Sequence, residues 1–149
     1  MEILSNVFKN SQIIPRRYTC DGKNFSPPLR FLDISKNAKS LALIMDDPDA
    51  PVGLWVHWLI WNIAPNVNAI NENQAPEKAV VGRNTSGTNK YTGPCPPDRE
   101  HRYFFKLYAL DITLDLPASA DKNQLENAIQ GHIIEEAELI GRYNRTNFT

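Results

Sequence analysis

Eleven prolines, against seven glycines, constrain the fold of this chain more than any other feature. Proline lacks a backbone N–H and fixes its own φ angle, so it is rare inside helices and central strands. The prolines stand at positions 15, 27, 28, 48, 51, 65, 76, 94, 96, 97 and 117. The segments between them are short, and the chain is expected to fold from short strands joined by stiff turns.

Several proline-free segments have the composition of β-strands, because they are rich in aromatic and branched residues. In chain order, the candidates are 3–8, 29–31, 40–45, 56–63, 80–81 and 102–110. The polar segment 81–92 has no period and is expected to form a long ordered loop.

One segment, 121–140, has a helical period instead. Its apolar residues recur at spacings of one, three and four, as they do on one face of a helix. The residues of this stripe are Leu125, Ala128, Ile129, His132, Ile133, Ala137 and Ile140. Asp121 or Ser119 is a candidate N-cap, and Gly131 is a candidate break. The sequence therefore predicts a mainly β fold with a late helical segment, in which His132 is a core residue.

Length and charge narrow the class of protein. A chain of 149 residues fits a single domain, 1–149, that can fold without a staple. A net charge of −1 argues against nucleic-acid binding through a bulk positive field. We find no signal-peptide pattern, and the longest apolar stretch, 58–63, is too short for stable membrane insertion. The expected location is the cytoplasm, where free thiols are favoured for Cys20 and Cys95. The alternative is a bridge between them, which would close a long loop and stabilise the fold by a few kcal/mol where the geometry allows it.

Two proline-rich motifs each precede a strand candidate that opens near a histidine. The motif at 46–51 precedes His57, and the motif at 93–97 precedes His101. Side chains alternate across a strand, so strict alternation places polar residues at one end of three otherwise apolar faces. These polar residues are Asp47, His57, His101 and Tyr103, and the face of His57 also holds Trp55, Leu59, Trp61 and Ile63. If the three faces meet in one core, the four polar residues cluster at its rim.

Each of these residues also has a purely structural interpretation. A histidine that begins a strand is usually a hydrogen-bonded residue near the surface, and Asp-Pro-Asp-Ala-Pro is typical of a turn. The sequence has no Gly-x-Ser-x-Gly, Gly-rich phosphate loop or His-Glu-x-x-His, so no catalytic residue and no cofactor is predicted. Asp47, Asp49, His57 and His101 are chemically suitable metal ligands, but their spacing matches no metal signature.

Together these motifs resemble the phosphatidylethanolamine-binding protein family, in its prokaryotic, Raf-kinase-inhibitor-like branch. The resemblance is carried by Asp47-Pro48-Asp49-Ala50-Pro51, His57-Trp58, Gly93-Pro94-Cys95-Pro96-Pro97 and His101-Arg102-Tyr103. It implies one domain with a large antiparallel sheet, a smaller sheet and peripheral helices. It also implies a cis bond between Ala50 and Pro51, and a homodimer.

The resemblance further implies a small pocket that accepts phosphate-like and carboxylate-like groups. Carried over by motif, the wall of the pocket is Asp47, Pro51, Trp55, His57, Gly93, Pro94, His101 and Tyr103. Imidazoles, a phenol and backbone N–H groups near Gly93 are suitable donors to an anion. Where the family commonly has glycine shortly before the second histidine, this chain has Asp98-Arg99-Glu100, which adds charge beside the pocket.

The leading hypothesis is therefore a non-enzymatic binding protein for a small anionic or phosphorylated ligand. One alternative is an inhibitor of a protein kinase or a protease that acts through surface loops. Another is a metal-dependent or acid–base enzyme.

Overall fold

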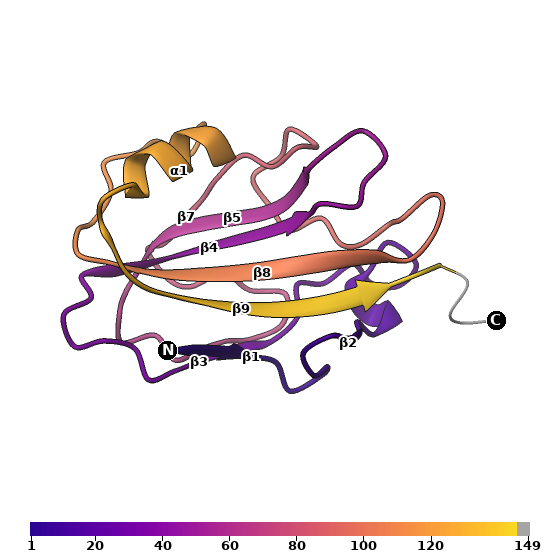
Figure 1. Cartoon of the computed structure of the whole chain (residues 1–149), viewed down its shortest axis with the longest axis horizontal. Helices are drawn as coiled ribbons and strands as arrows, with labels where there is room; N and C mark the ends of the chain where they lie inside the picture. The colour runs from indigo at the N-terminus through magenta and orange to yellow at the C-terminus, as the bar shows by residue number, and fades with distance from the viewer. Residues whose placement is uncertain (146–149) are drawn as a thin grey trace.

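The structure is a computed structural model that describes residues 1–145, and in these residues the chain forms two β-sheets and one α-helix (Figure 1). The larger sheet has six strands, in the order β2 (Gln12–Ile13), β9 (Ile133–Tyr143), β8 (His101–Leu110), β4 (Ser40–Asp47), β5 (Trp55–Ile63) and β7 (Val80–Val81). The smaller sheet has the order β1 (Glu2–Leu4), β3 (Leu29–Leu32) and β6 (Ala69–Ile70). The predicted mainly β fold with a large and a small sheet is confirmed.

Three central strands position the site described below. β4 lies between β5 and β8 and pairs antiparallel with both. These are the strands predicted at 40–45, 56–63 and 102–110, each longer by one or two residues. Because the pairing is antiparallel, the last residue of β4 and the first residues of β5 and β8 lie side by side at the same end of these strands. Those residues are Asp47, Trp55 and His101.

Each face of the six-stranded sheet has its own hydrophobic core. On one face, Leu43 and Phe105 belong to a core that also contains Ile3 and Phe31 of the smaller sheet. On the other face lies α1 (Lys122–Ile129), and its Leu125 and Ile129 share a core with Ile44, Leu59 and Trp61 of the sheet. The six-stranded sheet is therefore the middle layer of the fold (Figure 1).

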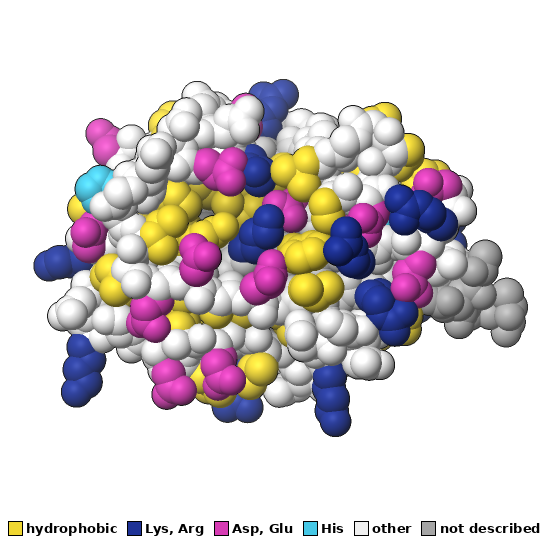
Figure 2. Space-filling model, in the orientation of Figure 1, with side chains coloured by type: hydrophobic (Ala, Val, Ile, Leu, Met, Phe, Trp, Pro, Cys, Tyr) yellow, Lys and Arg dark blue, Asp and Glu magenta, His cyan; other side chains and the backbone are white. Residues whose placement is uncertain are grey.

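Acidic and basic side chains are interspersed over the face of the molecule shown in Figure 2. No patch of one sign dominates this face, in keeping with the net charge of −1. Within residues 1–145, no helix is long and apolar enough to cross a membrane.

The helical segment predicted at 121–140 is only partly correct. α1 is capped by Asp121, whose side chain accepts a hydrogen bond from the Gln124 backbone, and it ends before Gly131, which has a φ of +82°. The residues that follow form β9, which pairs antiparallel with the whole of β8. Tertiary pairing along this long strand overrides the local helical period. His132 lies in the connecting turn, where its Nδ1 is 2.8 Å from Asp111 Oδ1, so its prediction as a core residue is wrong.

Two further expectations about covalent structure are also wrong. Cys20 and Cys95 form a disulfide, with their Cα atoms 5.4 Å apart, and are not free thiols. The backbone N–H of Cys20 donates to the Pro94 carbonyl, so the fold brings the two segments together across a separation of 75 residues. In the described part of the chain every peptide bond is trans, including the bond between Ala50 and Pro51.

Candidate functional site

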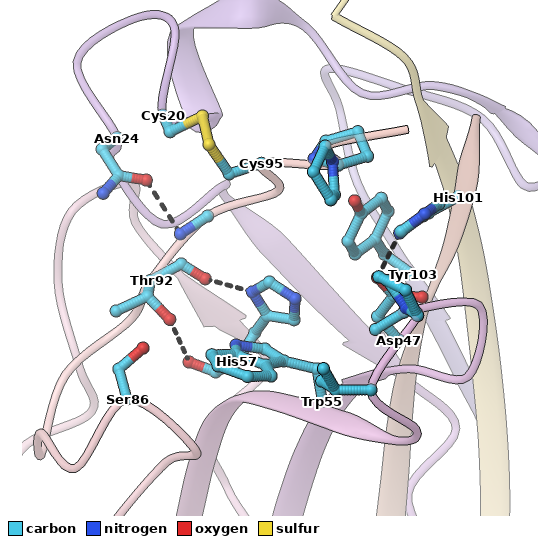
Figure 3. Close-up of a pocket in the computed structure, with 16 residues that line it drawn as sticks. Cys20, Asn24, Asp47, Trp55, His57, Ser86, Thr92, Cys95, His101 and Tyr103 are labelled. Atoms are coloured by element: carbon cyan, nitrogen blue, oxygen red, sulfur yellow. Dashed lines mark hydrogen bonds and ion pairs between the residues drawn. A yellow bond between two sulfur atoms is a disulfide. The ribbon is translucent and has the colours of Figure 1, made fainter. Parts of the chain in front are cut away.

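A cavity of about 430 Å³ lies at the end of the central strands, where β4 ends and β5 and β8 begin (Figure 3). Of the eight residues predicted for its wall, seven line it: Asp47, Pro51, Trp55, His57, Gly93, His101 and Tyr103. Pro94 does not line the cavity. It is buried behind the wall, and its carbonyl accepts the hydrogen bond from the Cys20 N–H.

An irregularity in β5 brings His57 into the cavity. Met45 pairs with Trp58 but Asp46 pairs with Val56, so His57 is one extra residue on β5 at this point. Bulges of this kind re-aim side chains and are common beside functional sites. A second irregularity lies between Ile60 and Ile63. The prediction that Leu59 and Trp61 share the face of His57 is therefore wrong, because both pack on the α1 side of the sheet.

His57 is held by the loop that precedes the second proline-rich motif. Its Nδ1–H donates to the Thr92 carbonyl at 2.6 Å, and only 5% of the residue is exposed. Burial lowers the pKa of the imidazole below its usual value, and this outweighs the hydrogen bond to Thr92, which acts in the opposite direction. The neutral ring is thus favoured, and its Nε2 is directed into the cavity as an acceptor (Figure 3).

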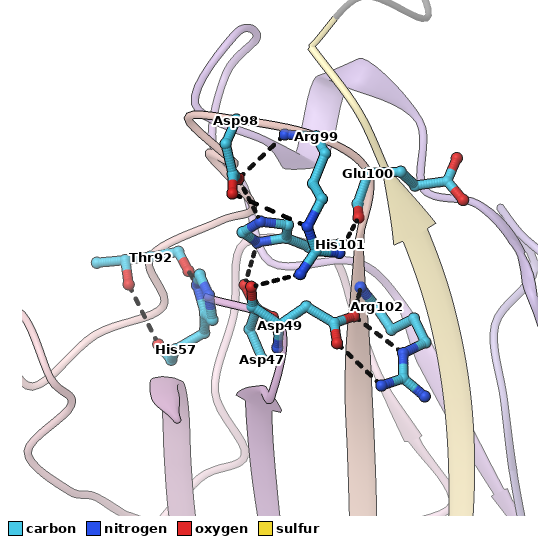
Figure 4. Close-up of polar contacts among 9 residues, drawn as sticks. All are labelled: Asp47, Asp49, His57, Thr92, Asp98, Arg99, Glu100, His101 and Arg102. Carbon is cyan, nitrogen blue, oxygen red and sulfur yellow. Dashed lines mark hydrogen bonds and ion pairs between the residues drawn. The ribbon is translucent and has the colours of Figure 1, made fainter. Parts of the chain in front are cut away.

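His101 is held between two carboxylates (Figure 4). Its Nδ1 lies 2.7 Å from Asp47 Oδ2, and its Nε2 lies 2.7 Å from Asp98 Oδ1. The hydrogen bond from His101 lowers the pKa of Asp98. The neighbouring carboxylate, Asp49, accepts from the backbone and the guanidinium of Arg102, and this contact lowers the pKa of Asp49 to about 2.

Tyr103 brings an unpaired hydroxyl to the cavity. The residue is fully buried, and its hydroxyl has no hydrogen-bond partner among residues 1–145. Its ring packs edge-on against His57, with the ring centroids 5.3 Å apart. Burial, with a smaller effect from the Asp47 carboxylate, raises the pKa of the phenol, so the group stays protonated and can donate.

The backbone at Gly93 differs from the expectation. Its N–H donates to Asn24 Oδ1 at 2.8 Å, so this donor is already occupied. A Cβ at position 93 would collide with the Asn24 side chain and the Tyr18 carbonyl, which explains why the chain needs glycine at this close approach.

The sequence reasoning missed the other residues that line the cavity: Cys20, Asn24, Ala50, Val52, Ser86, Thr92, Cys95, Pro96 and Pro97. Ala50, Cys95, Pro96 and Pro97 lie inside the motifs singled out above, so those motifs contained a signal for them. Asn24, Ser86 and Thr92 lie in polar loops, and nothing in their local sequence marks them as neighbours of the cavity. In the described residues, no group of three or more His, Cys, Asp or Glu is arranged to hold a metal ion.

Comparison with known proteins identifies the family. A family model described as phosphatidylethanolamine-binding protein matches residues 4–144, so the chain belongs to this family. A relative from Methanothermobacter thermautotrophicus, named UPF0098 protein, is 50% identical over 150 residues, which cover 97% of this chain and 99% of the relative.

Two solved structures share the fold. The homolog CT736 of Chlamydia trachomatis, described as a phosphatidylethanolamine-binding protein homolog, is 44% identical, with a TM-score of 0.94 over 97% of each chain. YbcL of E. coli, described as a new member of the mammalian family, is 28% identical, with a TM-score of 0.89 over 96% of this chain and 97% of its own.

Proposed function

We propose that this chain is a binding protein whose cavity accepts a small phosphate- or carboxylate-bearing group. The observation that carries the proposal is the Tyr103 hydroxyl, which is buried at the cavity and has no partner among residues 1–145. A buried polar group without a partner costs about 1–3 kcal/mol, and a ligand oxygen would remove that cost. An unpaired donor of this kind is a reason to expect a ligand.

The other groups around Tyr103 suit an acidic ligand, whether or not the ligand carries a proton of its own. His57 Nε2 accepts a hydrogen bond when the ring is neutral, and it donates one when the ring is protonated. None of the residues that line the cavity in the described chain is Lys or Arg. The ligand is therefore held by individual hydrogen bonds rather than by a strong positive field, which favours a singly charged group such as dihydrogen phosphate or a carboxylate.

Binding is favoured over turnover by the state of the two cysteines at the cavity. Cys20 and Cys95 are bonded to each other, so neither offers a thiolate nucleophile. The proposal therefore assigns no catalytic residue.

A second candidate function is inhibition of a protein kinase or a protease through a surface loop. It is favoured by the loop beside the cavity, where Val52 is 78% exposed and Leu54 is 46% exposed. Exposed apolar side chains grouped on one loop are typical of a protein contact.

The homodimer and the cytoplasmic location remain predictions. The disulfide bears on the location, because disulfides are most frequent in oxidising compartments.

Isothermal titration with inorganic phosphate and with acetate tests the proposed function. Tyr103→Phe removes only the unpaired hydroxyl. We expect the variant to bind phosphate and acetate roughly tenfold or more weakly than the native chain, as for the loss of a hydrogen bond to a charged ligand. Tyr108→Phe is the matched control, since Tyr108 lies on the same strand but packs on the α1 side of the sheet. Equal affinity of the Tyr103 variant and the native chain would refute the proposal.

A further inference from the structure

Several groups in the cavity wall that could donate to an anion are already occupied by partners within the chain. The Gly93 N–H donates to Asn24, and the Nδ1–H of His57 donates to Thr92. Both nitrogens of His101 face carboxylate oxygens. Of these candidate donors, only the Tyr103 hydroxyl lacks a partner in the described chain. An anion bound beside Tyr103 gains a second donor from this group if one of the occupied donors is released.

His101 is the donor that can be released, because its two carboxylate partners differ in how firmly they are held. The two ring nitrogens can donate to both carboxylates at once only when each nitrogen carries a proton. The Asp47 side chain is 4% exposed, and its second oxygen accepts from the Asp49 backbone. Asp47 is thus fixed at the end of β4.

Asp98 is held far more loosely. Its side chain is 43% exposed, and it lies between β-strands on the segment that also contains Pro96 and Pro97 of the cavity wall. Apart from His101, its closest contacts are with its neighbour Arg99, through the Arg99 backbone N–H at 3.0 Å and a 3.9 Å ion pair. Figure 4 shows the two carboxylates on opposite sides of the His101 ring.

We propose that Asp98 is a built-in competitor for the ligand: its carboxylate occupies the Nε2 proton of His101 that an incoming anion would otherwise take. The inference rests on the proposed function and adds a residue that sets the affinity of the same site. When Asp98 moves aside, an oxygen of the ligand replaces the Asp98 oxygen on Nε2, and Tyr103 donates to the same ligand. The carboxylate acts as an anion that the chain itself supplies.

Titration of purified variants with inorganic phosphate tests the inference. Asp98→Ala removes the competitor, and we expect phosphate to bind at least about tenfold more tightly, as for one hydrogen bond to a charged ligand. Asp98→Asn keeps the size of the side chain but removes its charge, and it guards against a loop that is altered by the alanine. Glu100→Gln is the matched control on the same segment. Glu100 pairs with Arg142 at a partly exposed site, so the phosphate affinity of the Glu100→Gln variant should stay within about twofold of the native value.

The exchange rate of the His101 Nε2 proton, followed by NMR, separates competition from a structural role. In the native chain Asp98 protects this proton. In Asp98→Ala the proton should exchange faster, and added phosphate should slow its exchange again. A residue that only shaped the loop would not be replaced by phosphate in this way.

The outcomes distinguish this inference from the proposed function. If Tyr103→Phe weakens phosphate binding but neither Asp98 variant strengthens it, the competitor role is overturned and the binding site stands. If neither the native chain nor either Asp98 variant binds phosphate, both the site and the competitor are refuted. Phosphate binding that is detectable only in the Asp98 variants supports the competitor role directly.

Discussion

Asp47 and His101 form a buried side-chain contact that joins the end of β4 to the start of β8, with Oδ2 and Nδ1 2.7 Å apart. The same two groups also pair at the surface, where Asp111 Oδ1 lies 2.8 Å from His132 Nδ1 with both side chains at least 40% exposed. The chain thus contains one chemical pair in two environments, which separates the effect of burial from that of the contact.

Removal of the buried carboxylate should be costly. Asp47→Ala leaves the His101 ring buried with one partner fewer, and we expect the free energy of unfolding to fall by about 1–3 kcal/mol, the cost of a buried polar group that loses its partner. Asp111→Ala removes the exposed equivalent and should cost about 1 kcal/mol or less. Urea denaturation measures both values. If the two variants lose similar stability, the buried pair has no special structural role.

The unpaired hydroxyl of Tyr103 should reduce stability in the absence of ligand. Tyr103→Phe removes a buried group that has no hydrogen bond among residues 1–145, so we expect the free chain to keep its stability or gain about 1 kcal/mol. Such a gain, together with weaker phosphate binding, is the signature of a residue retained for function. Thermal unfolding without ligand is the measurement, and a loss of more than about 1 kcal/mol would mean that the hydroxyl has a structural partner.

The ends of the central strands could be predicted from sequence because β4 and β8 alternate regularly. Asp47 and Tyr103 each lie on the face predicted for them, beside Met45 and Phe105 of the core. β5 contains two extra residues relative to β4, and their effects cancel at the ends of the strand. His57 therefore reaches the cavity, although the residues in the middle of the strand lie on the opposite face from the one predicted.

Other parts of the site could not be predicted because they depend on contacts distant in sequence. The disulfide joins segments 75 residues apart, and no spacing rule identifies such a pair. The period of 121–140 fits a helix locally, yet β8 offers a complete strand edge that β9 satisfies. The contact between Asp98 and His101 spans only three residues, but its meaning depends on Asp47, which approaches the same ring from another strand.

His57 should make the stability depend on pH. Burial lowers its pKa in the folded chain, whereas the unfolded imidazole takes up a proton near its ordinary value of about 6.5. Between the lowered pKa and about pH 6.5, the unfolded state binds more protons, so stability falls as the pH decreases through that window. The full stability of the folded chain with respect to His57 is therefore retained above about pH 6.5.

Urea denaturation from about pH 5 to pH 7 of the native chain and of His57→Gln measures this contribution. The difference in unfolding free energy between the two proteins should shrink as the pH falls, because the variant lacks the titrating group. Parallel curves would show that the His57 ring titrates alike in the folded and unfolded states.

The disulfide should stabilise the chain and contribute little to ligand affinity, although both cysteines line the cavity. Its closure of a long loop restricts the unfolded state, and we expect Cys20→Ser/Cys95→Ser to lose roughly 2–5 kcal/mol. The adjacent hydrogen bonds, from the Cys20 N–H to Pro94 and from the Gly93 N–H to Asn24, do not depend on the sulfur atoms. Phosphate affinity of the folded double variant should therefore stay within about threefold of the native value.

Melting curves with and without a thiol reductant provide the control, because reductant should lower the melting temperature of the native chain but not of the variant. An unchanged native melting temperature after complete reduction would contradict a stabilising role of the bond.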